Sequence, residues 1–246
     1  MPPRPLVLAA LIATLPLLPA KAAPRDCSVP PELIDSEDLH LPVTAERMRD
    51  KQPVTIVAIG GASTAGTAAT NPEQDAYPRR LEDNLRRRHP DMPITVVNKG
   101  VARQTTQDMV DRFPSDVYPL APTLVVWETG TADAVRSLDV DAFATALESG
   151  LADLKNHRLD IVLINMQYSR STASVINFEP YLEAMQHRAD VDDVYLFRRF
   201  EMMKYWSENG VFNFIDVPKE QRAPLATQVY ECLAERLAEA IERALR

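Results

Sequence analysis

The residues whose types could support chemistry most clearly begin where a buried strand is expected to end. Residues 54–59 are β-branched and apolar, which predicts a strand that is buried on both faces. Residues 60–64 follow as Gly-Gly-Ala-Ser-Thr, and the paired glycines permit a sharp turn. In an α/β sheet such a turn lies at the carboxyl edge, where ligands bind. We therefore expect a site here, and Ser63 is the first residue in the turn that could act as a nucleophile.

Strands and helices are expected to alternate along the whole chain after residue 53. We expect strands over 54–59, 93–98, 123–127, 160–166 and 194–197, and helices over 75–89, 105–113, 140–154, 178–188, 199–206 and 225–245. This alternation predicts an α/β fold in which a parallel sheet carries helices on both faces.

The residues at the strand ends resemble the motifs of the SGNH (GDSL) hydrolases. Gly60 and Gly66 bracket the first block with that family's spacing, and Asn98 opens the second. The third block corresponds to residues 127–133, and Tyr230-Glu-Cys-Leu-Ala resembles the start of the last helix in an exported subfamily. The resemblance covers residues 54–245. It implies a flavodoxin-like three-layer α/β/α sandwich with a five-stranded parallel sheet.

In the family that this chain resembles, a serine attacks the substrate and a histidine, oriented by an aspartate, is the base. The serine amide, a glycine amide and an asparagine side chain form the oxyanion hole. The matching positions here carry other residues. They are Ala62 for the serine, Arg103 for the glycine, Ala132 for the asparagine, and Gln221 and Pro224 for the aspartate and histidine.

These substitutions remove the chemistry that the motifs would support. Ala62 carries no nucleophile, and the loss of an oxyanion donor at Ala132 typically costs about 3–4 kcal/mol of transition-state stabilisation. No histidine follows His187, so the C-terminal part of the chain lacks the usual base. The first hypothesis is therefore a catalytically inactive protein, or pseudoenzyme, with a binding or accessory role at the cell envelope.

Two other hypotheses stay open. In one, Ser63 is the nucleophile of an active serine esterase with a rearranged site. The structural alternative for Ser63 is that its hydroxyl forms a hydrogen bond with the turn backbone. In the other, the chain is a purely structural subunit of an envelope assembly.

Several residues are candidates for binding an ester-bearing or polysaccharide ligand. Arg103 could hold a carboxylate or sulfate bidentately, or it could be an ordinary surface arginine. Asp133 could instead cap a helix or bond to a neighbouring loop. The full candidate set is Gly61, Ser63, Arg103, Thr131, Asp133 and Gln167.

Residues 1–22 have the features of a secretory signal peptide. A basic start precedes an apolar run over 6–18, and Ala20-Lys-Ala22 matches a cleavage site. An uncleaved anchor is the alternative. Residues 23–53 would form a polar lead-in and 54–246 one hydrolase-like domain.

Cleavage of the signal peptide changes the formal charge from −8 to −10, which argues against nucleic acid and anionic lipid surfaces as partners. We expect a periplasmic or extracellular protein with no other membrane span.

The two cysteines, Cys27 and Cys232, lie near opposite ends of the mature chain. Cysteines of exported proteins most often pair, so a disulfide is expected, with two separate buried thiols as the alternative. The resemblance supports the disulfide, since the exported subfamily carries similar cysteines.

The four histidines lack the spacing of metal ligands. No metal and no cofactor are expected.

Overall fold

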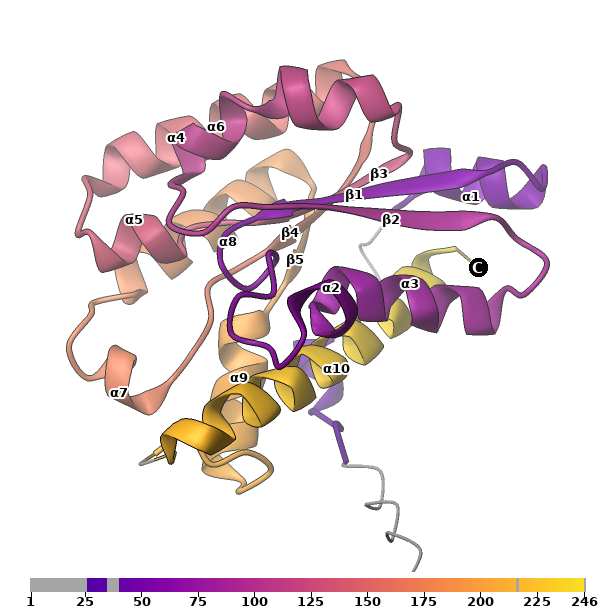
Figure 1. The fold of residues 1–246 in the computed structure, drawn as a ribbon. Helices are drawn as coiled ribbons and strands as arrows, with labels where there is room; N and C mark the ends of the chain where they lie inside the picture. The colour runs from indigo at the N-terminus through magenta and orange to yellow at the C-terminus, as the bar shows by residue number, and fades with distance from the viewer. Residues whose placement is uncertain (1–25, 35–39, 216, 246) are drawn as a thin grey trace, which may run out of the picture.

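The computed structural model describes residues 26–34, 40–215 and 217–245. The expected signal peptide lies outside the described residues. Five parallel strands form one sheet in the order β2-β1-β3-β4-β5 (Figure 1). The strands are β1 (Val54–Gly60), β2 (Ile94–Gly100), β3 (Leu124–Glu128), β4 (Asp160–Ile164) and β5 (Tyr195–Phe197). The predicted α/β fold with a five-stranded parallel sheet is therefore confirmed.

Helices cover both faces of the sheet, which makes the three-layer arrangement visible in Figure 1. Helices α4, α6 and α8 share one hydrophobic core with the sheet, and α3, α9 and α10 share the other. The α-helices are α1 (Pro42–Arg49), α2 (Pro72–Asp75), α3 (Tyr77–Arg88), α4 (Thr106–Val110), α5 (Thr131–Val135), α6 (Val140–Asn156), α7 (Arg170–Ala173), α8 (Glu179–Asp192), α9 (Arg199–Glu208) and α10 (Lys219–Ala244).

Alternate residues of the central strands enter opposite cores. Val126 of β3 packs in the core beside α3 and α10, whereas Val125 and Trp127 pack in the core beside α4, α6 and α8. Both faces of β3 are fully buried, which explains why its sequence is continuously apolar until Glu128.

Helix α10 begins earlier than the sequence predicts. It starts at Lys219 rather than near residue 225 and contains Pro224 in its interior. Gln221 and Pro224 therefore lie within the helix and are exposed, not in a loop that approaches the strand ends.

The segment expected as a polar lead-in contains helix α1, which docks at the amino edge of the sheet. The backbone N–H of Thr44 donates to Asp160 Oδ2 at 2.7 Å, at the start of β4. Leu41, just before the helix, is buried in the core.

The Cys27–Cys232 disulfide predicted from the sequence is present, with its Cα atoms 5.3 Å apart. It joins the N-terminal segment to the middle of α10. None of the helices within the described residues is long and apolar enough to cross a bilayer.

Candidate functional site

A cavity of about 330 Å³ lies at the carboxyl edge of the sheet, and we call it the carboxyl-edge cavity. The turn after β1, the loop after β2, the start of α5 and the residue Gln167 after β4 all contribute to it. The sequence candidates that line it are Gly61, Ala62, Ser63, Arg103, Thr131, Ala132 and Gln167. The parallel sheet thus brings together residues that are up to 106 positions apart in the chain.

Ala62 and Ser63 are neighbours with opposite environments. Ala62 is exposed at the cavity, whereas Ser63 is buried. The hydroxyl of Ser63 donates to Gln167 Oε1 at 3.0 Å. An amide oxygen is too weak a base to remove the hydroxyl proton in a catalytic step. Ser63 is therefore held in place but not activated.

Tyr230 of α10 lies near Ser63. Burial raises the pKa of the Tyr230 phenol, and the nearby Glu128 carboxylate acts in the same direction, whereas Ser63 acts to lower that pKa. The phenol stays protonated at neutral pH, so Tyr230 does not supply the missing base.

A buried ion pair lies beneath the cavity. Arg199 Nη2 donates to Glu128 Oε1 at 3.0 Å, and both side chains are almost fully buried. The other carboxylate oxygen of Glu128 accepts from the backbone N–H and the hydroxyl of Thr64, at 3.1 and 2.6 Å. This network fixes the turn after β1 against the end of β3.

This ion pair was not predicted from the sequence. The available signal is Glu128 itself, because an acid at the end of a buried apolar strand needs a partner. Its partner lies 71 residues further along the chain, so spacing alone cannot identify it.

The outer wall of the carboxyl-edge cavity is basic. Arg103 adopts a left-handed backbone conformation (φ 68°), and its carbonyl accepts from Arg136 Nη2 at 2.7 Å. Both arginines line the cavity. Thr131 Oγ1 and Gln104 Oε1 are buried there without a hydrogen-bond partner within the described part of the chain. The cavity thus offers cationic and neutral polar groups to a ligand, beside the Glu128 carboxylate, which also lines the cavity and is paired with Arg199.

Three candidate residues do not line this cavity. Asp133 is buried and accepts from the backbone N–H and the hydroxyl of Thr106, at 3.0 and 3.1 Å, so it ties α5 to the start of α4. Burial raises the pKa of Asp133. Of the two roles considered, the bond to a neighbouring loop is the one observed. Gln221 and Pro224, both in α10, are likewise absent from its wall.

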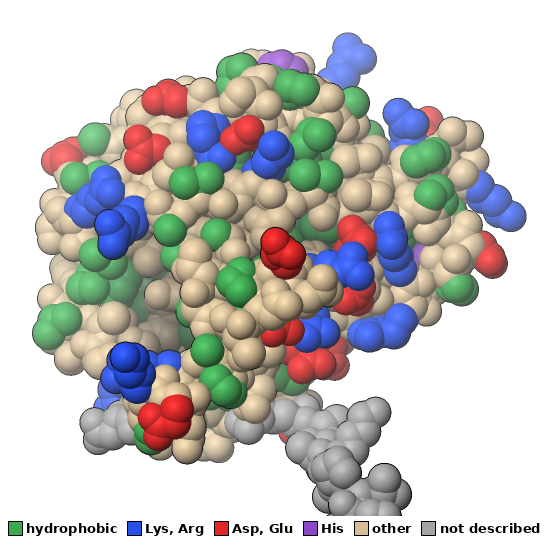
Figure 2. All heavy atoms as spheres, in the orientation of Figure 1, with side chains coloured by type: hydrophobic (Ala, Val, Ile, Leu, Met, Phe, Trp, Pro, Cys, Tyr) green, Lys and Arg blue, Asp and Glu red, His purple; other side chains and the backbone are tan. Residues whose placement is uncertain are grey.

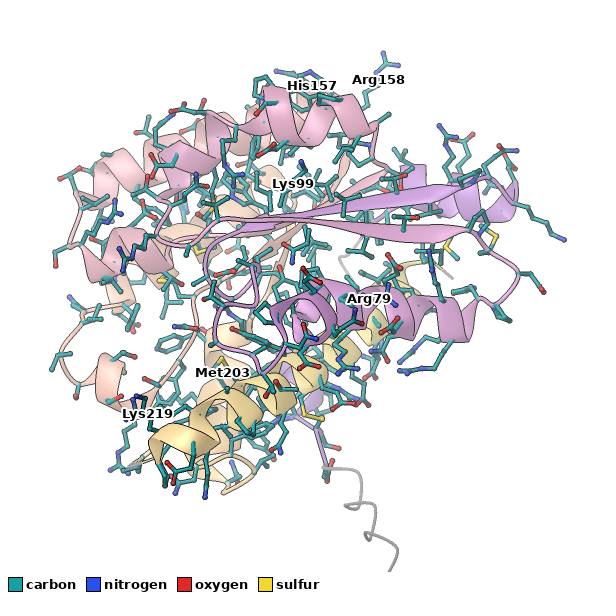
Figure 3. All side chains as sticks on the ribbon, in the orientation of Figure 1. Arg79, Lys99, His157, Arg158, Met203 and Lys219 are labelled. Atoms are coloured by element: carbon teal, nitrogen blue, oxygen red, sulfur yellow. A yellow bond between two sulfur atoms is a disulfide. The ribbon has the colours of Figure 1, made fainter. Side chains whose placement is uncertain are left out.

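No histidine lines the carboxyl-edge cavity among the described residues, which include all four histidines of the chain. His89 and His157 directly precede β2 and β4 and so lie toward the amino edge, with His157 at the end of α6 in Figure 3. His89 pairs with Glu242 at 2.6 Å, and His157 stacks on Tyr118. His40 and His187 are exposed elsewhere. The site can bind a small polar group but lacks an imidazole beside Ser63.

Comparison with known proteins agrees with this architecture. The family model described as "Non-GDSL lipase-like family" matches residues 26–246. No curated protein sequence matches the chain.

Solved structures share the fold at low sequence identity. A putative lipolytic protein of the G-D-S-L family from Desulfitobacterium hafniense DCB-2 has 18% identity and a TM-score of 0.60, over 76% of this chain and 99% of its own. A catalytic mutant of Axe2, an acetylxylan esterase from Geobacillus stearothermophilus, has 18% identity and a TM-score of 0.62, over 79% of this chain and 96% of its own. A two-domain esterase active on acetylated mannans, co-crystallised with mannopentaose, has 14% identity and a TM-score of 0.69, over 83% of this chain and 54% of its own.

Proposed function

We propose that this chain, which belongs to the non-GDSL lipase-like family, is an exported protein that binds an ester-bearing or polysaccharide ligand without hydrolysing it. The ligand occupies the carboxyl-edge cavity. The protein acts by binding or presenting that ligand at the cell envelope.

The observation that carries the proposal is the pairing of Ala62 with an unactivated Ser63. Ala62 faces the cavity where the resemblance places the nucleophile, and it has no reactive atom. The Ser63 hydroxyl donates a hydrogen bond to Gln167 Oε1 and has no imidazole beside it. A serine without a base is a weak nucleophile, so acyl transfer at this site is strongly disfavoured.

The ligand class follows from the cavity and from the similar structures. A volume of about 330 Å³ is at the lower end for small-molecule sites, and it suits one sugar ring with an ester group. Two of the similar structures are esterases whose names specify acetylated mannans or acetylxylan. We therefore propose an acetylated polysaccharide, with Arg103 and Arg136 favouring one that also carries acidic groups.

Binding is tested by calorimetry on the mature, disulfide-bonded protein with acetylated xylo-oligosaccharides and manno-oligosaccharides. Arg103→Gln should weaken binding of a ligand that carries acidic groups, whereas Arg158→Gln, on an exposed arginine at the end of α6, should not. No heat with any of these oligosaccharides would contradict the proposed ligand class.

The absence of hydrolysis is tested with p-nitrophenyl acetate on the wild type and Ser63→Ala. Equal rates at the level of the blank are expected. The alternative, an active esterase that uses Ser63, is favoured only by the position of Ser63 on the cavity wall. It predicts a saturable rate that Ser63→Ala removes and covalent labelling of Ser63 by a fluorophosphonate.

A further inference from the structure

A second and larger cavity, of about 920 Å³, lies on the other side of Gln167. We call it the flanking cavity. It is enclosed by the loop after β4 with α7, by α9 and by the N-terminal half of α10. Figure 2 shows a hollow bordered by hydrophobic side chains on the flank where α7 lies in Figure 1. Among the described lining residues Gln167 is the one that the two cavities share, so the cavities are adjacent and otherwise have different walls.

One wall of the flanking cavity is aliphatic. Met203 lies between α9 and α10 in Figure 3, and Leu225, Ala226 and Val229 continue the wall along α10. Methylene and methyl groups of this kind favour an alkyl chain, because burial of apolar surface drives its binding.

The serine hydroxyls of the opposite wall are already engaged. Ser169 Oγ is bonded to Thr172 Oγ1 at 2.8 Å, and Ser174 donates to the carbonyl of Ser171 at 2.8 Å. A sugar needs available hydrogen-bond partners around its ring, and these hydroxyls have local partners instead. The wall chemistry therefore favours an alkyl chain over a saccharide.

Two arginines contribute positive charge to the wall of this cavity. Arg170 and Arg222 line it from α7 and α10, and neither forms an ion pair with any residue that the structure describes. Within the described part of the chain, the hydrogen bond of the Arg222 side chain is from Nε to the carbonyl of Val217, at 3.1 Å. No acidic residue is found among the described lining residues. Unpaired guanidinium groups bind carboxylates and phosphates through charge-assisted hydrogen bonds.

We propose that the flanking cavity binds a single-chain amphiphile with an anionic head group. The alkyl chain lies along Met203, Leu225 and Val229, and the head group, a carboxylate or a phosphate, is held by Arg170 and Arg222. The volume is within the range of sites for ligands of this size. This proposal does not depend on the ligand of the carboxyl-edge cavity.

The test measures binding of dodecanoate and dodecyl phosphate below their micellar concentrations to the mature, oxidised protein. Dodecanol and dodecyltrimethylammonium are the neutral and cationic comparisons. At least one of the two anions should bind at least about tenfold more tightly than the cation, and the tighter anion identifies the head group. Arg170→Gln with Arg222→Gln should weaken that anion at least about tenfold and leave dodecanol nearly unchanged.

Two variants locate the alkyl chain. Ala226→Trp, which fills the cavity, should abolish binding of every probe. Leu225→Asp, on a half-buried side chain, should weaken the anions far more than the cation and serves if Ala226→Trp does not fold. The matched control is Arg103→Gln in the carboxyl-edge cavity, which should leave amphiphile binding unchanged.

Three results would overturn the proposal: no binding of either anion to the wild type, equal binding of the cation, or undiminished binding to both cavity variants. Each is distinguishable from failure of the proposed function, which concerns oligosaccharide binding and its response to Arg103→Gln.

Discussion

At the scale of single residues, the carboxyl-edge cavity differs from an esterase site in more than one place. Ala62 faces the cavity without a reactive atom, and Ser63 is held by a hydrogen bond to Gln167. Restoring one group should therefore not restore catalysis, because nucleophile and base act as a unit.

Ala62→Ser tests this expectation. The new hydroxyl would face the cavity at an exposed position, yet no histidine in the described chain lies beside it to accept the proton. We expect p-nitrophenyl acetate hydrolysis to stay at the level of the blank and of the Ala62→Gly control. A saturable rate in Ala62→Ser would reveal a base that this geometry does not provide.

The ion pair of Arg199 and Glu128 should dominate local stability. Arg199→Met leaves the Glu128 carboxylate buried without its cation, which typically costs about 3–5 kcal/mol in the free energy of unfolding. Urea denaturation followed by circular dichroism measures the change. Lys204→Met on the same helix is the matched control, because Lys204 and Glu208 are exposed and 4.0 Å apart, and its effect should stay within about 0.5 kcal/mol. A loss below about 1 kcal/mol for Arg199→Met would contradict the assigned role.

Sequence alone predicts which residues follow each strand, but not which of their side chains line the cavity and which bond to a neighbouring segment. Gly61, Ser63, Arg103 and Thr131 were expected at the strand ends and do line one cavity. Asp133 was also a ligand candidate, but its carboxylate is engaged by Thr106. The choice between lining a cavity and bonding a neighbouring loop depends on side-chain direction, which periodicity does not specify.

At the scale of helices and strands, the ends of each strand predicted from the sequence lie within about two residues of the observed ends, and the helix ends agree less well. The strand pattern is strong because both faces of the central strands are buried. Helix α10 begins at Lys219 and continues through Pro224 in its interior, whereas proline normally indicates the end of a helical stretch, so its first residues were not predicted. Helix α1 was missed because few of its residues are buried.

The packing of α6 on β3 depends on Gly150. A Cβ atom at this position would lie 2.4 Å from Trp127 Cη2 and 2.8 Å from Val110 Cγ2. Trp127 is fully buried and packs edge-on against Phe113, so it has little freedom to move.

Gly150→Ala should therefore destabilise the fold by about 1–3 kcal/mol. Alanine favours a helix over glycine by about 1 kcal/mol, so a net loss means that the clash outweighs the helical preference. Thermal and urea unfolding measure the change. Ser149→Ala, at the adjacent exposed position of α6, is the control and should be neutral or slightly stabilising. A stabilised Gly150→Ala variant would show that Trp127 can repack.

At the scale of the whole molecule, one covalent bond joins the N-terminal segment to the middle of α10. The Cys27–Cys232 disulfide encloses 205 positions and holds the N-terminal segment against α10. Trp206 Nε1 also donates to the carbonyl of Ser28 at 3.2 Å, so the segment is fixed next to the disulfide as well. The pairing was predicted from the sequence because the chain has only two cysteines and the expected export would keep them oxidised.

The disulfide should contribute most of its effect by restricting the unfolded chain. For a loop of this length the chain-entropy model gives about 5 kcal/mol, the upper end of measured values. We expect Cys27→Ser with Cys232→Ser to lower the free energy of unfolding by about 3–5 kcal/mol in urea. Reductant should destabilise the wild type by a similar amount and leave the double variant unchanged. If the double variant instead unfolds at the wild-type urea concentration, the packing of the N-terminal segment, and not the covalent bond, holds the chain ends together.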